Sequence, residues 1–431
     1  MHYNVELPKS WNDMAPKLHN GIVVDMRRLR SNIERFAEIG RNEDGGIYRM
    51  AFSAADFEAR TALIESLKQI GLHGEMDGAG NVIGRPKSQR DQAAVMIGSH
   101  LDSVPAAGCL DGALGVLCGL ECLQRIKEQK IETRRPIELV AFSDEEGRFG
   151  SLFGSKAMVG EINPDLLQTT VDLSGVALAD AMRERGLEPL KALSARRSRD
   201  SVHAYVELHI EQGPTLDRLG KPIGVVNAIT GLFKWCIRLK GEADHAGTTP
   251  MPMRKDAFSG LAEFAGEIPR ILEEHGGERS VATIGRVKLS PGTANTVPAL
   301  AEFTLDVRDA DARKLATLAD AFRTALSAIA RRRGLMFEFD ILSEVPPVSC
   351  DARIVEDILR IAGELHADPV LMPSGAAHDA QVMARLAPIG MIFVPSVGGR
   401  SHSPAEWTHW EDIELGANVL LRTALQLAEV V

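Results

Sequence analysis

Histidine and acidic side chains stand at the ends of short apolar segments of this sequence. In "GSHLDSVPAAGCLDGALGV" (98–116), His100 closes one such segment and Asp111 comes just before a helical pattern. In "IELVAFSDEE" (137–146), a second apolar segment ends in three acids. Like charges packed at a buried strand end disfavour ionisation unless a cation compensates them. The cluster therefore predicts a cation site, with hydration of the acids at an exposed strand end as the alternative.

Two further histidines fit the same chemistry. "YVELHIEQGP" (205–214) alternates like a strand and contains His209, and "SHSPAEW" (401–407) places His402 in a loop. Imidazole and carboxylate ligands together suit zinc, manganese, cobalt or nickel, whereas a single histidine is more often an ordinary polar residue. Asp102 is placed to accept a hydrogen bond from the second ring nitrogen of the preceding histidine. The set predicted to bind two metal ions is His100, Asp111, Glu146, His209 and His402.

The elements that must position these residues follow from hydrophobic periodicity. Residues 93–100, 137–146 and 391–396 are short, apolar and β-prone, which predicts three buried strands. Apolar residues at helical spacing over 113–128 predict a helix directly after Asp111. Strands alternating with helices predict an α/β fold with a mostly parallel sheet. In such sheets ligands bind beyond the carboxyl ends of the strands, where these histidines and acids lie.

The middle of the chain has a different pattern. From about residue 221 to residue 334 the expected order is strand, helix, strand, strand, helix, which is typical of a small α+β sandwich. We predict that 218–334 is a second domain, inserted into a metal-binding domain that comprises 1–217 and 335–431. A chain of 431 residues is long enough for more than one domain.

The composition limits the classes of function. A net charge of −10 argues against general nucleic-acid binding, which needs excess lysine and arginine to neutralise phosphates. No apolar stretch reaches the ~20 residues that a membrane-spanning helix needs, and the first eleven residues lack the pattern of a signal peptide. The five cysteines are scattered, which indicates reduced thiols. We expect a cytoplasmic protein without a nucleic-acid or membrane partner.

A series of motifs, spread from about residue 45 to the C-terminus, resembles a known family. The motifs are "GSHLDSV", "GCLDGALGV", "FSDEEGRF", "YVELHIEQGP", "GEADHAGTTPM", "LDVRD", "PSGAAHDA" and "GRSHSPAEW". They resemble the two-metal amidohydrolases of the aminoacylase and carboxypeptidase type. Within that family they are similar to the branch of N-carbamoyl-L-amino acid hydrolases and allantoate amidohydrolases. The resemblance implies a di-metal catalytic domain with an inserted α+β domain that acts as a lid and forms a homodimer.

The resemblance also implies two divalent metal ions per subunit. The first ion is implied to be bound by His100, Asp111 and His209. The second ion is implied to be bound by Asp111, which bridges the two, together with Glu146 and His402. Glu145 is implied to be the general acid and base for a metal-bridging hydroxide that acts as the nucleophile. An exchange of roles between Glu145 and Glu146 is the alternative.

Substrate-binding residues are implied in the same way. His245 in "ADHAGTTP" is implied to polarise the substrate carbonyl from the partner subunit, with a turn-capping role as the alternative. Asn295 and Arg308 resemble residues that bind the substrate α-carboxylate, for which the planar guanidinium is suited. The alternative for Arg308 is a salt bridge with Asp306 or Asp309. The remaining implied pocket residues are Gln212, Gly398 and Gly399. Two more residues match the family without an assigned role, namely His378 and Asp379.

The implied function is hydrolysis of the ureido C–N bond of N-carbamoyl-L-amino acids, giving the L-amino acid, carbon dioxide and ammonia. The alternatives are allantoate, N-carbamoyl-β-alanine, and N-acyl amino acids or dipeptides as substrates. A binding module that has lost catalysis is disfavoured, because all the expected ligands and Glu145 are present. Two departures weaken the transfer of substrate specificity. The segment 147–158 is shorter than in many carbamoylases, and Leu110 stands where relatives often have an aromatic residue.

Overall fold

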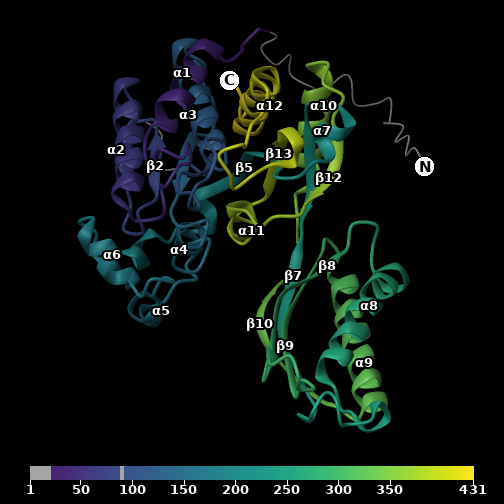
Figure 1. Cartoon of the computed structure of the whole chain (residues 1–431). Helices are drawn as coiled ribbons and strands as arrows, with labels where there is room; N and C mark the ends of the chain where they lie inside the picture. Colours follow the sequence, from purple (N-terminus) through teal and green to yellow (C-terminus); the bar gives the residue numbers. More distant parts are fainter. Residues whose placement is uncertain (1–20, 88–91) are drawn as a thin grey trace. The chain divides into compact units, whose positions relative to one another are not determined.

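The computed structural model describes residues 21–87 and 92–431 (Figure 1). The expectation for the first eleven residues lies outside the described residues. The α-helices are α1 (Met26–Ala37), α2 (Ala54–Gln69), α3 (Ala113–Glu128), α4 (Phe153–Val159), α5 (Pro164–Thr169), α6 (Leu178–Glu184), α7 (Thr215–Leu219), α8 (Ala257–His275), α9 (Ala312–Arg333), α10 (Ala352–Glu364), α11 (Asp379–Met383) and α12 (Trp410–Ala428). The strands are β1 (His73–Met76), β2 (Val82–Arg85), β3 (Ala94–His100), β4 (Ile137–Phe142), β5 (Val202–Ile210), β6 (Gly224–Ile229), β7 (Gly231–Lys240), β8 (Val281–Ser290), β9 (Leu300–Asp309), β10 (Met336–Val345), β11 (Val348–Ser349), β12 (Val370–Ser374) and β13 (Ile389–Val394). Short 3-10 helices are η1 (Pro189–Ala195), η2 (Arg199–Ser201), η3 (Met251–Met253) and η4 (Val397–Gly399).

The larger sheet has a parallel centre. Its strand order is β1-β2-β4-β3-β5-β13-β6-β11, with β12 beside β6. The strands β4, β3, β5 and β13 are mutually parallel, whereas the pairings toward both edges are antiparallel. Parallel neighbours need a crossover connection, which α3 provides between β3 and β4. The predicted α/β fold is confirmed, and the carboxyl ends of four strands meet at one edge of the sheet.

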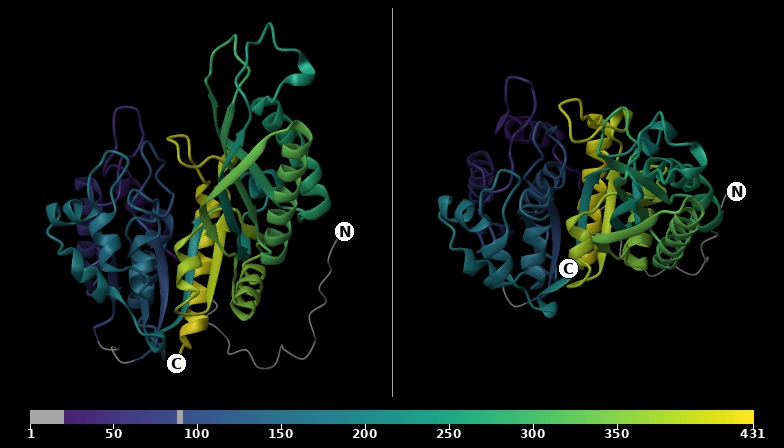
Figure 2. Two further views of the ribbon diagram at one scale, coloured as in Figure 1. Left: turned by 90° about the horizontal axis from the view of Figure 1, so that it is seen from below. Right: turned by 60° about the horizontal axis from the view of Figure 1, so that its bottom comes forward.

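Helices cover both faces of this sheet. At Gly416 in α12, a Cβ atom would lie 3.1 Å from Leu208 Cδ1 in β5. The backbone N–H of Ala380 in α11 donates a hydrogen bond to the carboxylate of Glu207, over 3.0 Å. Consecutive strand residues point to opposite faces, so α12 and α11 pack on opposite sides of β5. Both helices are labelled in Figure 1, and α12 is the long yellow helix near the C-terminus in Figure 2.

The predicted elements around the histidines and acids are confirmed. The segments expected as strands at 93–100, 137–146 and 391–396 form β3, β4 and β13, and the helix expected at 113–128 is α3. Every residue of these three strands is buried. Complete burial is expected for parallel strands that are covered on both faces, because neither face meets water.

Contacts between residues divide the chain into two compact units. The first unit comprises the described residues up to Val226, with Cys350–Leu371 and His378–Val431. The second unit comprises Asn227–Ser349 and Met372–Ala377. The elements β7, α8, β8, β9 and α9 of the second unit follow one another in the order expected from the sequence.

One strand of the second unit differs from the expectation. The sequence pattern placed the return to the first domain at residue 335, but β10 pairs with β7 in the four-stranded antiparallel sheet β10-β7-β9-β8. An alternating strand has the same local pattern in either sheet. Its membership is therefore decided by long-range pairing, which the local sequence does not encode.

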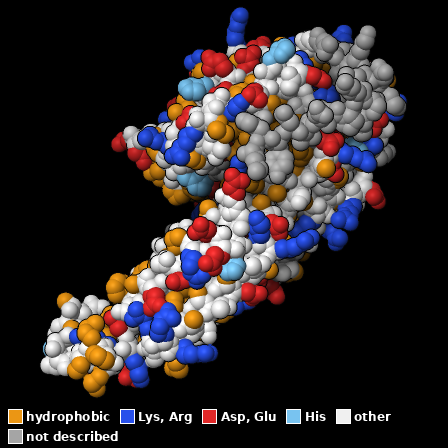
Figure 3. All heavy atoms as spheres, turned by 90° about the vertical axis from the view of Figure 1, so that its right-hand side faces the viewer, with side chains coloured by type: hydrophobic (Ala, Val, Ile, Leu, Met, Phe, Trp, Pro, Cys, Tyr) orange, Lys and Arg blue, Asp and Glu red, His pale blue; other side chains and the backbone are white. Residues whose placement is uncertain are grey.

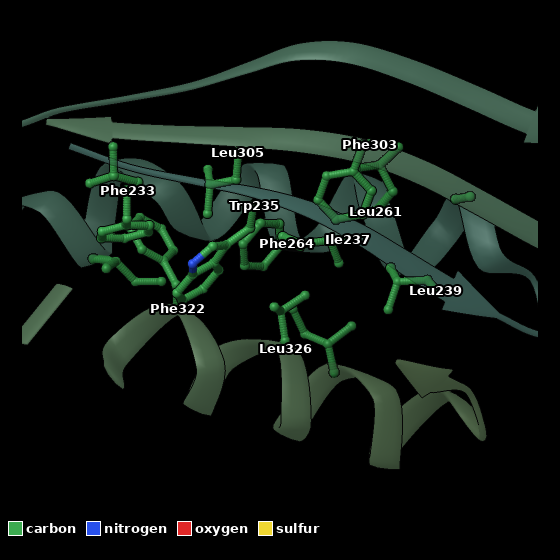
Figure 4. Packing of buried hydrophobic residues seen from close by; sticks show 14 of the residues in the cluster. Phe233, Trp235, Ile237, Leu239, Leu261, Phe264, Phe303, Leu305, Phe322 and Leu326 are labelled. Atoms are coloured by element: carbon green, nitrogen blue, oxygen red, sulfur yellow. The ribbon is translucent and has the colours of Figure 1, made fainter. Parts of the chain in front are cut away.

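The second unit has a hydrophobic core of its own. Figure 4 shows side chains of β7 and β9 packed against those of α8 and α9. The ring of Phe264 lies 5.7 Å from that of Phe303 and 5.9 Å from that of Phe322, measured between centroids. Aromatic pairs at such separations add to the stabilisation that burial itself provides. This core supports the second unit separately from the larger sheet.

The surface and the cysteines agree with the composition. On the face drawn in Figure 3, basic and acidic side chains are interspersed over the second unit. Within 21–87 and 92–431, no helix is both long enough and apolar enough to span a membrane. All five cysteines are free, as predicted.

Candidate metal centre

The candidate metal ligands gather where the parallel strands end. His100 is the last residue of β3, and His209 is the last but one residue of β5. Glu145 and Glu146 follow β4, and His402 lies in the loop after β13. All of them belong to the first unit. The carboxyl-end position predicted from the sequence is the position that the structure shows.

Three of the loops at this edge contain a residue with left-handed backbone. Asp144, Gln212 and His402 have φ values of 52°, 58° and 55°. Residues other than glycine adopt this region at an energetic cost, so it persists only where the surroundings enforce it. Strain of this kind is typical of functional sites, because it aims side chains in directions that regular structure cannot provide.

Hydrogen bonds hold the acidic loop in its strained form. The carboxylate of Asp144 accepts from the backbone N–H of Phe149, with oxygen distances of 3.0 and 3.3 Å. The carbonyl oxygen of Glu145 accepts from the Ser151 hydroxyl over 2.7 Å and from the Leu152 N–H over 3.2 Å. The loop therefore presents its carboxylates in a fixed direction.

The first ligand group consists of His100, Asp111 and His209, whose ligand atoms lie within 4.8 Å of one another. Asp111 Oδ1 is 3.7 Å from His100 Nε2 and 3.3 Å from His209 Nε2. Nδ1 of His100 lies 3.0 Å from the carbonyl oxygen of Asp102, and Nδ1 of His209 lies 2.9 Å from that of Ile210. A carbonyl only accepts, so Nδ1 of each ring carries the proton. In each neutral ring the lone pair is therefore on Nε2, the atom that would bind a cation, and in His209 this atom also lies 3.2 Å from the backbone N–H of Gly112.

The second ligand group consists of Asp111, Glu146 and His402. His402 Nε2 is 3.3 Å from Asp111 Oδ2 and 3.4 Å from Glu146 Oε2. Asp111 therefore turns one carboxylate oxygen toward each group. The other oxygen of Glu146, Oε1, is buried and has no hydrogen-bond partner among the described residues. A buried carboxylate oxygen without a donor is costly, and a cation would remove that cost.

The acids at this site are hard to ionise without a cation. Burial raises the pKa of Glu146 to about 9, and the charges of Asp111 and Asp102 add to the shift. Burial also raises the pKa of Glu145 well above its usual range, followed by the charges of Asp379 and Glu146. Imidazole and carboxylate donors facing shared points fit a borderline divalent metal. The residues present therefore fit metal ions.

The histidines respond to the same surroundings in opposite ways. Burial lowers the pKa of His100 to about 4. Burial also disfavours the charged form of His209, but its hydrogen bond to Asp111 and the charge of that carboxylate raise the pKa to about 9. In the metal-free protein, the proton on His209 occupies a position that a metal ion would take.

Asp102 acts differently from the prediction. The hydrogen bond from His100 goes to the backbone carbonyl of Asp102, and the nearer carboxylate oxygen is 4.0 Å from the ring nitrogen. The carboxylate instead accepts from the backbone N–H of Glu146, over 3.2 Å. The sequence spacing correctly placed Asp102 beside His100, but side-chain and main-chain oxygens cannot be distinguished by spacing.

Of the predicted pocket residues in the first unit, Gln212 is the one that the structure places against the ligands. The amide nitrogen of Gln212 donates to Asp111 Oδ2 over 2.8 Å and is 3.4 Å from His402 Nε2. The N–H of Gly398 donates to Asp217 over 3.0 Å, and that of Gly399 donates to a carbonyl in its own turn over 2.8 Å. Gln212 therefore contacts the ligands directly, whereas both glycine N–H groups are bonded within the protein.

In the second unit, the structure brings His245 and Asn295 together. The N–H of Ala246 donates to the carbonyl of Asn295 over 2.9 Å, and both predicted residues are exposed. Arg308 lies on β9, where its guanidinium donates to Asp306 over 3.0 Å and to the Gly375 carbonyl over 3.0 Å. The salt bridge considered as the alternative for Arg308 is thus present in this structure.

The sequence analysis named His378 without a role but did not single out Glu207, and both residues are buried behind the ligands. Glu207 accepts from the hydroxyls of Ser99 and Tyr205, over 2.7 and 3.1 Å, besides its bond from α11. The ring of His378 packs edge-on against that of His209, with centroids 4.6 Å apart. Glu207, His209 and His378 form a third group whose ligand atoms lie within 4.8 Å of one another, but three donors already satisfy Glu207, which argues against a metal ion there. The sequence signal that could have identified Glu207 was its place two residues before His209, on the same face of β5.

Comparison with known proteins identifies the wider group. The family model "Peptidase family M20/M25/M40" matches residues 96–426. The N-carbamoyl-L-amino acid amidohydrolase of Geobacillus stearothermophilus is 40% identical over 411 residues, which cover 94% of this chain and 100% of the relative. The allantoate amidohydrolase of Escherichia coli (strain K12) is 35% identical, over 93% of this chain and 97% of the relative.

A solved structure agrees with these sequence matches. The hydantoinase/carbamoylase family amidase from Burkholderia multivorans superimposes with a TM-score of 0.88 at 35% identity. The match covers 94% of this chain and 98% of that chain. The matched lengths include both units of the fold, so the similarity is not limited to the candidate metal centre.

Metal binding is expected to release protons at neutral pH. At pH 7.5 the metal-free protein holds protons on His209 and Glu146, because both pKa values are about 9. Metal ligands must be deprotonated, so the apparent affinity should rise with pH up to about 9, by roughly tenfold per unit for each proton released. Calorimetric titration of the metal-free protein with Mn²⁺, in two buffers of different ionisation enthalpy, measures this release.

The same titration at pH 9.5 is the control, since both groups are then largely deprotonated and the release should be small. Binding at pH 7.5 without any net release of protons would contradict the arrangement described for His209 and Glu146.

Proposed function

Because this chain belongs to peptidase family M20/M25/M40 and is an amidohydrolase, we propose that it hydrolyses the ureido C–N bond of N-carbamoyl-L-amino acids. The products are the L-amino acid, carbon dioxide and ammonia. The observation that carries this proposal is a carboxylate, Asp111, shared by two ligand groups, with Glu145 beside them. The 40% identity to a named N-carbamoyl-L-amino acid amidohydrolase supports this choice of substrate.

We propose two divalent ions per subunit, of zinc, manganese, cobalt or nickel. The first would be held by His100, Asp111 and His209, and the second by Asp111, Glu146 and His402. When bound, the ions would polarise the substrate carbonyl and make a water molecule acidic near neutral pH. The shared carboxylate of Asp111 supports a pair of ions, because each of its oxygens faces a separate histidine group.

Glu145 would move the proton in this reaction. Its side chain is nearly buried, and Oε2 lies 3.7 Å from His100 Nε2, so it stands at the edge of the first ligand group. It would take a proton from the attacking water and return it to the nitrogen that leaves the carbamoyl carbon. A raised pKa suits this task, since the group must both accept and release a proton near neutral pH.

The second unit would recognise the substrate as a lid. His245 of the partner subunit would donate a hydrogen bond to the substrate carbonyl, where charge develops as the tetrahedral intermediate forms. Asn295 and Arg308 would bind the α-carboxylate, for which the guanidinium must exchange its present bond with Asp306. The remaining pocket residues would be Gln212, Gly398 and Gly399.

The nearest competing function is hydrolysis of allantoate. An allantoate amidohydrolase from Escherichia coli is 35% identical over nearly the whole chain, against 40% for the carbamoylase relative. Both substrates are ureido compounds with a carboxylate, so the same ligands and the same base would serve either. The contacts that distinguish the two substrates would be those to the part of the molecule beyond the shared ureido and carboxylate groups.

Replacement of Glu145 by glutamine should lower kcat by at least ~100-fold while both ions remain bound, because the amide cannot carry the proton. Ammonia release and metal content of the purified variant measure the two effects. The matched variant Glu146→Gln should instead lose affinity for one ion. Full activity of Glu145→Gln would overturn the proposed role, and the reverse pattern would exchange the roles of the two glutamates.

A substrate panel should separate the candidate activities. Enzyme loaded with manganese or zinc is expected to release ammonia fastest from N-carbamoyl-L-amino acids. The comparison substrates are the D-forms, N-carbamoyl-β-alanine and allantoate. Turnover of allantoate alone would contradict the proposed substrate and leave the metal and base assignments in place.

We further expect a homodimer that forms through β8. This strand is one of the two edge strands of the second unit's sheet, none of its residues is buried, and Val281 and Val287 are 51% and 48% exposed. An exposed edge strand is a ready template for pairing with another chain. Sedimentation equilibrium should give twice the chain mass of 46.7 kDa, and Val287→Lys should weaken the association. A monomer mass for the wild type at micromolar concentration would contradict this expectation.

A further inference from the structure

We propose that Glu406 is a positioning residue that sets the affinity of the second metal site. It does so by joining the loop that carries His402 to the loop that carries Asp111. The inference rests on the proposed pair of ions, and adds to it a residue that belongs to neither ligand group. Glu406 is only 4% exposed, although a glutamate is normally found in water.

Glu406 holds the main chain of the Asp111 loop. Its Oε1 atom accepts hydrogen bonds from the backbone N–H groups of Leu110 and Asp111, over 2.9 and 3.0 Å. Two consecutive N–H groups on one carboxylate oxygen fix both the position and the tilt of the peptide between them. Bonds of this kind to a charged acceptor are among the stronger hydrogen bonds in proteins.

The other oxygen of Glu406 reaches the Asp111 side chain through Ser401. The Ser401 hydroxyl lies between the two carboxylates, 3.1 Å from Glu406 Oε2 and 2.7 Å from Asp111 Oδ2, and its single proton is donated to one of them at a time. Oδ2 is the oxygen that faces His402 in the second ligand group. Ser401 directly precedes His402, so the contact also ties down the residue before the strained ligand. Glu406 thus constrains both the bridging carboxylate and a ligand of the second ion.

The absence of a side chain at Gly108 leaves space for the Glu406 side chain. At Gly108, a Cβ atom would fall 2.4 Å from Glu406 Oε1 and 2.4 Å from its Cβ. Contacts under 3.0 Å do not occur between real Cβ atoms and their neighbours, so a side chain at Gly108 would displace Glu406. The loop before Asp111 is therefore built around the glutamate.

The two histidines of the first ligand group are held by other means, so this group shares only Asp111 with the contacts of Glu406. The rings of His100 and His209 are oriented by the backbone carbonyls of Asp102 and Ile210, and neither bond involves Glu406. Loss of Glu406 should therefore disturb the second site more than the first. Such selectivity distinguishes a positioning role from a general contribution to folding.

The test is a Mn²⁺ titration of the metal-free full-length chain by calorimetry, which gives two dissociation constants, together with the thermal unfolding midpoint. In Glu406→Ala the affinity for the second ion should fall ~10–100-fold, as is typical when a residue behind metal ligands is removed. The first ion should change by less than about threefold. Because the expected change is in metal affinity, activity of the loaded enzyme is not needed as a readout.

Two further variants keep the test decisive. In Glu406→Gln the amide oxygen can still accept from both N–H groups and the amide nitrogen can donate to Ser401, so second-site affinity should stay within a few-fold of wild type. Ser401→Ala removes only the hydroxyl on Asp111 Oδ2, and should weaken the same ion by a smaller factor. Ser401→Ala also serves as the measurement if Glu406→Ala does not fold.

The matched control is Glu121→Ala. Glu121 is another buried glutamate that accepts from a backbone N–H, that of Asp25, but it ties α1 to α3. The Glu121→Ala substitution should lower the unfolding midpoint and leave both dissociation constants for Mn²⁺ unchanged.

The outcomes separate the two proposals. Two bound ions in the wild type, with selective loss of the second in Glu406→Ala and recovery in Glu406→Gln, would support the inference. Two ions in the wild type with unchanged or equally weakened binding in Glu406→Ala would overturn the inference alone. A single ion in the wild type would overturn the proposed ion pair, and the inference with it.

Discussion

The carboxylate of Asp111 is the group on which the rest of the site depends. It is buried, and burial alone would keep it protonated, yet hydrogen bonds from His209 and His402 hold its pKa well below the usual range. Its two oxygens face different histidines, so the ionised form is needed on both sides at once. The neighbouring loops can be understood as the means of keeping this one carboxylate ionised, fixed and shared.

The residue after Asp111 must be one without a side chain. Gly112 has a φ of 63°, and a Cβ atom there would lie 2.3 Å from the ring of His100. Only glycine both adopts this backbone and leaves space for the imidazole. α3 begins at the next residue, Ala113, so the turn from ligand to helix is completed without a spacer. The same segment therefore positions a ligand, supports a second ligand and starts the crossover between two parallel strands.

Beneath the site, two arginines offset part of its negative charge. Arg60 is fully buried, donates to Asp56 over 2.8 Å and lies 3.9 Å from Asp102. Arg49 is also buried and donates to the carbonyl oxygen of Leu101 over 2.6 Å. Buried charges are tolerated only when paired and hydrogen-bonded, and these cations serve the acids behind the ligands rather than the ligands themselves. The acids at the strand ends remain to be neutralised by protons or by the proposed metal ions.

The sequence by itself determined the elements and the chemical types. Apolar periodicity identified β3, α3, β4 and β13, because burial and alternation are local properties of a chain. The histidines and acids at the ends of these elements were the predicted metal ligands. Tertiary structure decided which atoms meet. It assigned β10 to the second sheet, gave the bond from His100 to the main-chain oxygen of Asp102, and brought Glu406 onto the N–H of Leu110, 296 residues away. Such contacts depend on how distant segments close on one another, and hydrogen-bond partners across that distance leave no periodic trace in the sequence.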